Sequence, residues 1–224
     1  MSRHIVITGG NRGIGLEIVK SYVANGDKVT VLCRQSSDDL DSLNVKVITN
    51  VDVTDMNSIK KAKHSLEGQS VDILINNAGL LTQEAIEEFD DRAIERINTQ
   101  FQINSLGPLM VTAAFLDLLQ EGAKVVLITS RMGSVEDNDS GTRYGYRMSK
   151  AALNMAGKSL SIDLAPRGIA VALLHPGWIQ TAMTGYTGHT TPDNAAASLV
   201  ERIEALNLEN TGTFWHANGE KLPW

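Results

Sequence analysis

Short runs of apolar, mostly β-branched residues alternate along the chain with longer segments of helical periodicity. Several of these runs are continuously apolar, which is typical of parallel strands covered on both faces. The runs predict strands at residues 4–7, 29–32, 45–48, 73–75, 125–128, 169–174 and 213–215.

Helical spacing fills the intervals between the runs. Ile14, Ile18 and Tyr22 recur at four-residue steps, Gly26 is a plausible stop, and a second stripe spans residues 56–66. Repeated strand–helix alternation predicts an α/β fold, a Rossmann-type doubly wound parallel sheet of about seven strands with helices on both faces. The acidic stretch 36–41 is expected to be a loop.

The bulk composition narrows the class of protein. The 224 residues suit one domain, taken here as residues 1–224, and 42% hydrophobic residues are ordinary for a globular chain. A net charge of −6 argues against nucleic acid as the main partner. The single cysteine, Cys33, fits a reducing compartment, and no apolar run approaches a membrane span. We therefore expect a cytoplasmic protein with no membrane partner.

A glycine-rich loop lies between the first predicted strand and the first predicted helix. Its sequence is Thr8-Gly9-Gly10-Asn11-Arg12-Gly13-Ile14-Gly15. Glycines at this point allow a sharp turn and a close approach to a pyrophosphate, and the helix start offers free N–H groups to phosphates. The alternative is an ordinary turn, but the position favours a dinucleotide site.

Further motifs follow in a recognisable order. After the Thr-Gly-x-x-x-Gly-x-Gly loop come Asp52-Val53, Asn76-Asn77-Ala78-Gly79, Ser130, Tyr146-x-x-x-Lys150 and Pro176-Gly177. With these motifs the chain resembles the short-chain dehydrogenase/reductase family over essentially its whole length. The stretches around Ser130 and Tyr146 and the ending Leu222-Pro223-Trp224 resemble a narrower branch, the sniffer-type carbonyl reductases and C-factor-like proteins.

The residue after the second strand indicates which dinucleotide binds. An Asp or Glu at this place usually holds the ribose of NAD, whereas Arg34 occupies it here. A guanidinium can bind a phosphate in bidentate fashion, and Arg12 is a second cation at the same end. The family resemblance implies that these two residues go with NADP(H), and NAD(H) stays possible. The alternative is that both arginines only face solvent.

The resemblance also implies the remaining cofactor contacts. Asp52 and Val53 would lie by the adenine, although Asp52 could equally be a polar residue at a helix entry. The implied cofactor-binding residues are Gly9, Asn11, Arg12, Gly13, Ile14, Gly15, Arg34, Asp52, Val53, Asn77, Ala78, Gly79, Tyr146, Lys150, Pro176, Gly177, Ile179 and Thr181. The five histidines show no metal-ligand spacing, so no metal site is predicted.

Tyr146 and Lys150 are the candidate acid–base pair. They are four positions apart on a predicted helix, so their side chains share one face. Hydride transfer to a carbonyl leaves negative charge on oxygen, which requires a nearby proton donor. A phenol has a pKa near 10 in water, and an adjacent ammonium is expected to lower it. This reasoning makes Tyr146 the general acid or base and Lys150 its activator.

The resemblance adds two further catalytic residues. Ser130 would orient the carbonyl, and Asn104 would hold a water that relays protons towards Lys150, which would itself also bind the nicotinamide ribose. Each residue has a competitor nearby. Ser134 competes with Ser130, Tyr144 with Tyr146, and Asn98 with Asn104. The strand-end position favours Ser130, and the lysine four residues on favours Tyr146. The following Ser105-x-Gly107-Pro108 favours Asn104.

The sequence therefore predicts an NADP(H)-dependent oxidoreductase that acts on a small-molecule carbonyl or alcohol. A dinucleotide-binding signalling or sensor protein is the alternative from another class. A sugar-nucleotide epimerase is disfavoured because little chain follows Gly177. Small residues after Tyr146, at 151–157, permit close helix packing, and the resemblance implies a homo-dimer or homo-tetramer. Packing of this helix against its own sheet is the alternative. Residues 180–192 are expected to cover the site.

Overall fold

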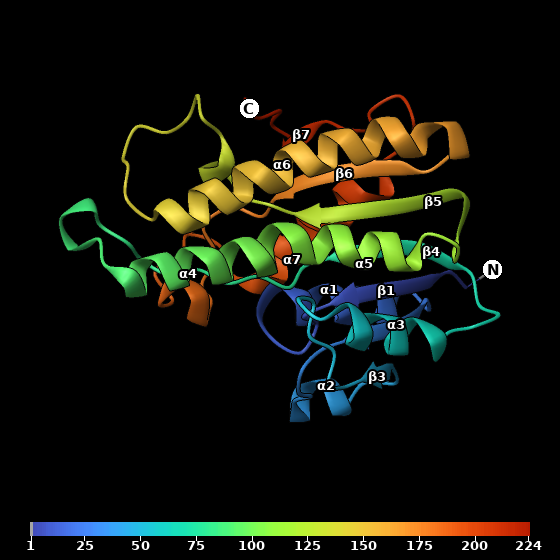
Figure 1. Ribbon diagram of the computed structural model, residues 1–224. Coiled ribbons are helices and arrows are strands. Elements are labelled where there is room, and N and C mark those ends of the chain that lie inside the picture. The colour runs from blue at the N-terminus through green and yellow to red at the C-terminus, as the bar shows by residue number, and fades with distance from the viewer. Residues whose placement is uncertain (1) are drawn as a thin grey trace.

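A seven-stranded parallel sheet forms the centre of the molecule (Figure 1). The computed structural model describes residues 2–224, and its strands lie in the order β3-β2-β1-β4-β5-β6-β7. The strands are β1 (His4–Thr8), β2 (Lys28–Leu32), β3 (Lys46–Ile48), β4 (Val71–Asn76), β5 (Leu119–Ile128), β6 (Ala170–His175) and β7 (Phe214–His216). The predicted Rossmann-type doubly wound sheet is confirmed.

Helices cover both faces of the sheet, as Figure 1 shows. Helices α1 and α7 pack together on one face, while α3, α4, α5 and α6 cover the other. The helices are α1 (Gly13–Ala24), α2 (Asp38–Asp41), α3 (Met56–His64), α4 (Asp91–Phe101), α5 (Gly107–Phe115), α6 (Tyr144–Leu164) and α7 (Pro192–Glu204). A π-helical segment, Gln102–Leu106, joins α4 to α5.

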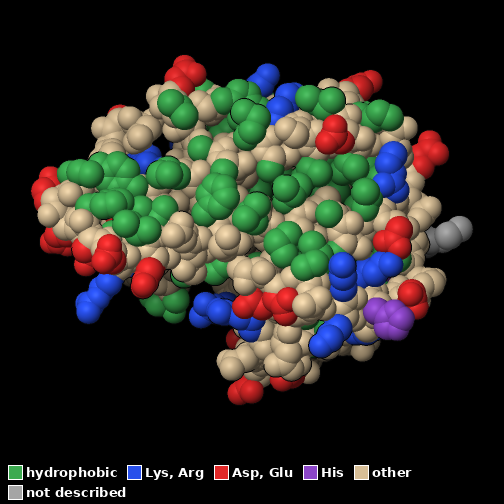
Figure 2. All heavy atoms as spheres, in the orientation of Figure 1, with side chains coloured by type: hydrophobic (Ala, Val, Ile, Leu, Met, Phe, Trp, Pro, Cys, Tyr) green, Lys and Arg blue, Asp and Glu red, His purple; other side chains and the backbone are tan. Residues whose placement is uncertain are grey.

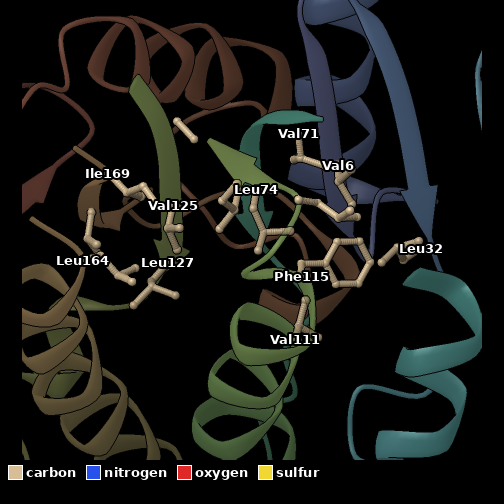
Figure 3. Close-up of a cluster of buried hydrophobic side chains, with 14 of the residues drawn as sticks. Val6, Leu32, Val71, Leu74, Val111, Phe115, Val125, Leu127, Leu164 and Ile169 are labelled. Atoms are coloured by element: carbon tan, nitrogen blue, oxygen red, sulfur yellow. The ribbon is translucent and has the colours of Figure 1, made fainter. Parts of the chain in front are cut away.

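Two apolar clusters hold these layers together. Ile5 and Ile7 of β1 pack towards α1 and α7, and Val6 packs on the opposite face with Phe115 of α5 (Figure 3). All of these side chains are buried. Because successive strand residues point to opposite faces and both faces are covered, the strands require continuously apolar runs.

Strand β5 begins earlier than predicted. The pattern gave residues 125–128, but the strand extends back to Leu119. Its first half contains the polar residues Gln120 and Glu121, which are exposed, and the register with β4 shifts here. A strand start that is exposed to solvent carries no apolar pattern, so the sequence contains no signal for it.

The prediction of a loop at residues 36–41 was wrong. Residues Asp38–Asp41 form the single-turn helix α2. The Ser37 hydroxyl accepts a hydrogen bond from the Leu40 amide at 3.2 Å and caps the turn. The same hydroxyl donates to the Asn11 carbonyl at 2.7 Å, which ties the turn to the glycine loop.

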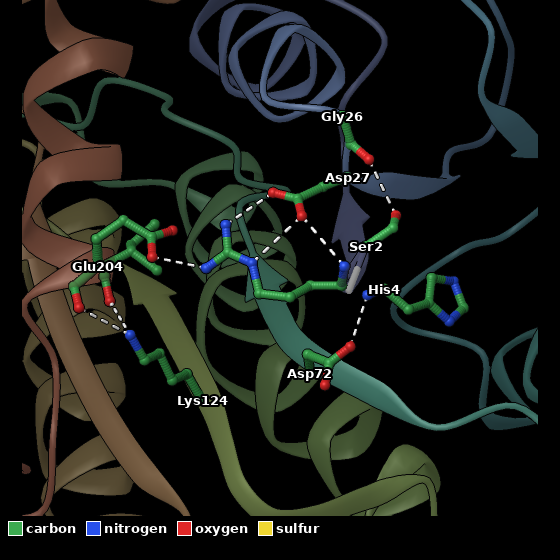
Figure 4. A network of polar contacts seen from close by, with 9 residues as sticks. Ser2, His4, Gly26, Asp27, Asp72, Lys124 and Glu204 are labelled. Atoms are coloured by element: carbon green, nitrogen blue, oxygen red, sulfur yellow. Dashed lines mark hydrogen bonds and ion pairs between the residues drawn. The ribbon is translucent and has the colours of Figure 1, made fainter.

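An ionic network closes the amino-terminal edge of the sheet (Figure 4). Arg3 pairs with Asp27 at 2.7 Å and with Glu204 of α7 at 2.6 Å. The Lys124 ammonium donates to the carbonyl oxygens of Ile203 and Glu204. Partly exposed pairs of this kind contribute about 0–1 kcal/mol each. The network therefore orients the end of α7 and leaves the carboxyl-terminal edge of the sheet for other contacts.

Candidate active site

The carboxyl ends of the strands gather the predicted polar residues at one edge. Thr8, Asn76 and His175 are the last residues of β1, β4 and β6, and Ser130 follows β5. A cavity of about 500 Å³ opens there. The predicted residues that line it are Ile14, Ser130, Tyr146, Pro176, Gly177, Ile179 and Thr181. Ligands of open parallel sheets bind at this edge.

Tyr146 lies in the first turn of α6 and lines the cavity beside Ser130. Burial raises the pKa of its phenol to about 12, and the Ser130 hydroxyl and the charge of Arg143 oppose this shift. The expected lowering of the phenol pKa is thus not found, because removal of the phenolate from water outweighs the Ser130 hydrogen bond and the charge of Arg143. The phenol is protonated at neutral pH and can donate a proton.

Lys150 lies one turn further along α6, beneath Tyr146. Its ammonium donates a hydrogen bond to the Ile128 carbonyl at the end of β5, at 2.9 Å, and lies 5.7 Å from the centroid of the Tyr146 ring. Burial lowers the pKa of Lys150 to about 8. The two side chains share one face of α6 as predicted, but Lys150 directs its charge at a backbone carbonyl.

Asn104 is buried within the π-helical segment, a feature that often marks functional sites. Its Oδ1 accepts from the Leu80 amide at 2.8 Å, and its Nδ2 donates to the Leu80 carbonyl and the Ser149 hydroxyl. The side chain therefore joins the segment after β4 to α6. A Cβ on Gly79 would lie 3.4 Å from Asn104 Oδ1 and 3.9 Å from Lys150 Nζ. Glycine keeps the space beside the ammonium open.

The glycine loop has the geometry of a phosphate cradle. Gly9 and Gly13 adopt positive φ angles of 68° and 57°. No side chain caps α1 and its first turn carries no acidic residue, so its N–H groups are available to an anion. A Cβ on Gly15 would overlap the Asn77 amide nitrogen, whereas one on Gly13 would meet only Thr181 across the cavity. The residues present fit a dinucleotide pyrophosphate.

Several predicted contact residues instead hold the loop in place. Asn77 Nδ2 donates to the carbonyl oxygens of Thr8 and Gly9 at 3.1 and 2.9 Å. The Ala78 amide donates to the Thr8 hydroxyl, and Asn11 Nδ2 donates to the Gln35 carbonyl. Contacts from these residues to a cofactor stay a prediction.

The adenosine end of the predicted site carries two exposed cations. Arg12 and Arg34 are both exposed, and within residues 2–224 neither forms an ion pair. Asp52 Oδ1 accepts from the amide and hydroxyl of Thr54, which lowers the pKa of the carboxyl group. The side chain of Val53 is buried against Gly107. Asp52 therefore also stabilises the turn that leads into α3.

The competing residues are placed elsewhere. The Ser134 hydroxyl donates to the Trp224 backbone oxygen at 3.0 Å and accepts from the Asp137 amide, so it is already engaged. Asn98 is exposed on α4, and Tyr144 is not among the residues that line the cavity.

The outer wall of the cavity contains residues that the sequence reasoning did not select. Arg131 pairs with Asp137 at 2.7 Å, and the ring centroid of Trp178 lies 5.8 Å from the guanidinium of Arg143, a residue outside the cavity lining. His175 packs edge-on against His216 at 4.9 Å, and burial lowers its pKa to about 3. His175 also lines the cavity. Its position at a strand end was the signal available for it.

Residues 2–224 contain neither a metal-binding cluster of side chains nor a helix suited to spanning a membrane. No group of three or more His, Cys, Asp or Glu side chains there could hold a metal ion. None of the helices described has the length and apolar character needed to cross a membrane.

Two curated proteins are similar to this chain in sequence. A 1-hydroxy-2-glutathionyl-2-methyl-3-butene dehydrogenase of Rhodococcus sp. (strain AD45) is 38% identical over 226 residues, covering 98% of this chain and 99% of that protein. The C-signal protein of Myxococcus xanthus is 45% identical over 157 residues, covering 69% of this chain and 93% of that protein.

Solved structures and a family model agree with these similarities. The carbonyl reductase Sniffer of D. melanogaster is 29% identical with a TM-score of 0.91, each chain being covered completely. An NADPH-bound carbonyl reductase from chicken fatty liver is 29% identical with a TM-score of 0.90, covering 100% of this chain and 99% of that one. The family model for short chain dehydrogenase matches residues 3–192. The resemblance to the family and to its sniffer-type and C-factor-like branch is confirmed, and the chain belongs to the short chain dehydrogenase family.

Proposed function

We propose that this chain is an NADP(H)-dependent oxidoreductase that transfers a hydride between the nicotinamide and a carbonyl or alcohol carbon of a small molecule. One observation carries the proposal: Tyr146 and Ser130 line a cavity that also reaches the start of α1, with Lys150 buried behind the phenol. The glycine loop would hold the pyrophosphate, and Arg12 and Arg34 would hold the 2′-phosphate. The bound cofactor would supply or accept the hydride.

Side chains of the protein would carry out the proton transfer. In the direction of reduction, Ser130 would orient the carbonyl oxygen, and Tyr146 would donate its phenolic proton to that oxygen. The resulting phenolate would be stabilised by the Lys150 ammonium and the Ser130 hydroxyl. Asn104 would hold α6 and the segment after β4 in a fixed position relative to each other. A relay water would bind its Oδ1, which accepts one hydrogen bond from the Leu80 amide and has a second lone pair.

The similarity to C-signal supports a second candidate, a signalling or sensor protein that binds the dinucleotide without needing turnover. The complete set of Ser130, Tyr146 and Lys150 favours the oxidoreductase, because a sensor has no need of a proton donor. The buried Cys33, the single cysteine, supports a location in the reducing cytoplasm.

Replacing Tyr146 by Phe tests the proposed proton donor. We expect kcat for reduction of aldehydes and ketones to fall by about 10²- to 10⁴-fold, because the general acid is lost. NADPH binding, followed by its fluorescence, should change little. The panel of substrates should include glutathione conjugates, because the Rhodococcus relative is a dehydrogenase of a glutathionyl compound.

Tyr144→Phe is the matched control for this experiment. This change also removes a tyrosine hydroxyl, two residues earlier on α6, and the kcat of the variant should stay at the wild-type value. Undiminished turnover in Tyr146→Phe would contradict the assigned role.

Replacing Arg34 by Ala tests the cofactor preference. A charge-assisted hydrogen bond contributes about 1.5–3 kcal/mol, so the Kd for NADPH should rise roughly 10- to 100-fold. The Kd for NADH, which lacks the 2′-phosphate, should stay within about twofold of the wild-type value. Arg92→Ala, at an exposed arginine of α4, should leave both constants unchanged. Equal weakening of NADPH and NADH by the Arg34 change would overturn the assignment.

We further infer that the chain forms a homo-dimer or homo-tetramer through α4, α5 and α6. Hydrophobic side chains gather over these helices in Figure 2. The large apolar side chains exposed there are Ile94, Phe101, Leu109, Met148, Met155 and Ile162. Met155 is 70% exposed, and contiguous apolar surface of this kind is typical of protein interfaces.

Sedimentation equilibrium tests the assembly. We expect the wild-type chain to sediment as a dimer or tetramer and Met155→Lys to shift it towards the monomer, because a buried lysine charge opposes association. Leu208→Lys changes an exposed leucine outside these helices and should leave the mass unchanged. A wild-type protein that is monomeric at every concentration would exclude this interface.

A further inference from the structure

The start of α6 lacks a local cap. Thr142 and Arg143 both adopt left-handed backbone angles, with φ of 53° and 52°, although neither is glycine. Arg143 occupies the N-cap position, and its side chain makes no capping hydrogen bond. Left-handed geometry is unfavourable for a β-branched residue such as Thr142, and uncapped N–H groups in a buried turn are destabilising. The turn that carries Tyr146 therefore needs support from outside its own sequence.

Glu84, in the segment after β4, provides this support. Its backbone carbonyl accepts a hydrogen bond from the Arg143 amide at 3.0 Å. Its carboxylate Oε2 accepts a second from the Gly145 amide at 3.1 Å. Both amides belong to the start of α6, and Tyr146 is the next residue along the chain. A negative charge at this position is also favourable towards the N-terminal end of the helix dipole.

The Glu84 carboxylate is itself held rigidly. Its side chain is 0% exposed. Oε1 accepts hydrogen bonds from the Thr82 hydroxyl at 2.5 Å and from Gln100 Nε2 at 3.0 Å. The Thr82 amide in turn donates to Gln100 Oε1 at 3.0 Å. A buried carboxylate is unfavourable unless it is well hydrogen-bonded, and three donors satisfy this one.

The packing around the carboxylate leaves little freedom. A Cβ on Gly145 would overlap Gln100 Nε2 and would lie 3.0 Å from the Ile97 Cα, so glycine is needed for α6 to approach α4. The Nε of Arg96 lies 3.9 Å from Glu84 Oε1. The start of α6 is thus fixed against α4 through a buried polar cluster, which is more directional than apolar packing.

The same segment contacts the active site at its other end. Leu80 makes two hydrogen bonds with Asn104, and Leu81 lines the cavity. Residues 80–84 therefore connect the Asn104 side chain to the first turn of α6. A displacement of Glu84 would move both the cavity wall and the phenol.

We propose that Glu84 is a positioning residue, which fixes the first turn of α6 and so places the Tyr146 hydroxyl for proton transfer. This proposal rests on the proposed function and deepens it. Glu84 touches neither the substrate nor the cofactor in this role. It acts through the Gly145 and Arg143 amides.

The test compares Glu84→Gln and Glu84→Ala with Glu88→Gln, which makes the same chemical change at an exposed carboxylate of the same segment. A glutamine has one acceptor oxygen, so it can satisfy either Gly145 or the Thr82–Gln100 side. Alanine satisfies neither. Small misplacements of reacting groups reduce rates by up to about 100-fold. We expect kcat to fall several-fold in Glu84→Gln and about 10- to 100-fold in Glu84→Ala, with Glu88→Gln at the wild-type value.

Two further measurements separate positioning from a general loss of structure. The Kd for NADPH should stay within about twofold of wild type in Glu84→Gln, because the proposed phosphate contacts, at the glycine loop, Arg12 and Arg34, lie on other elements than α6. Hydrogen exchange should rise in a peptide spanning residues 143–149 and stay unchanged in one spanning residues 9–16. The isosteric Glu84→Gln variant carries the test if Glu84→Ala does not fold.

Unchanged kcat in Glu84→Gln with raised exchange at 143–149 would overturn the positioning role, as would NADPH binding that weakens in parallel with kcat. Unchanged exchange at 143–149 would overturn the structural basis. A wild-type protein that reduces no carbonyl compound would refute the proposed function instead, and the exchange experiment would still decide whether Glu84 holds α6.

Discussion

The hydrogen bond between the Lys150 ammonium and the Ile128 carbonyl fixes α6 over the carboxyl end of β5, and the rest of the site depends on this contact. It requires the helix to lie very close to the sheet. A Cβ on Gly133 would come within 2.6 Å of the Lys150 backbone carbon, and one on Gly157 within 2.6 Å of Leu127. These two glycines therefore let α6 approach closely enough to bury both Lys150 and Tyr146.

Burial shifts the pKa values of Tyr146 and Lys150 in opposite directions. It favours the neutral form of each, which raises the pKa of Tyr146 to about 12 and lowers that of Lys150 to about 8. A protonated phenol beside an amine that titrates near physiological pH is suited to donating a proton in carbonyl reduction. Negative charge that develops on the phenol then faces the Lys150 ammonium, which lies 5.7 Å from the ring centroid in surroundings of low dielectric.

The sequence was informative wherever a residue's role depends on its neighbours in the chain. Continuous apolar runs predicted the sheet, and the four-residue spacing placed Tyr146 and Lys150 on one face of α6. The sequence could not show that desolvation of the phenolate outweighs the interactions that stabilise it, so the expected lowering of the Tyr146 pKa was wrong. It also gave no signal for Glu84, whose partner Gly145 is 61 residues away. A lone glutamate in a polar segment is usually solvated, and only the fold reveals that this one is buried.

The pH dependence of kcat/KM for carbonyl reduction tests most directly whether the burial of Lys150 controls proton transfer. Since burial lowers the pKa of Lys150 to about 8, the amine is charged below that pH and neutral above it. The neutral amine cannot stabilise a phenolate, so kcat/KM should fall about tenfold for each pH unit above about 8. A profile that stays level to about pH 10 would contradict the account, because the pKa of Lys150 would then not be lowered by burial.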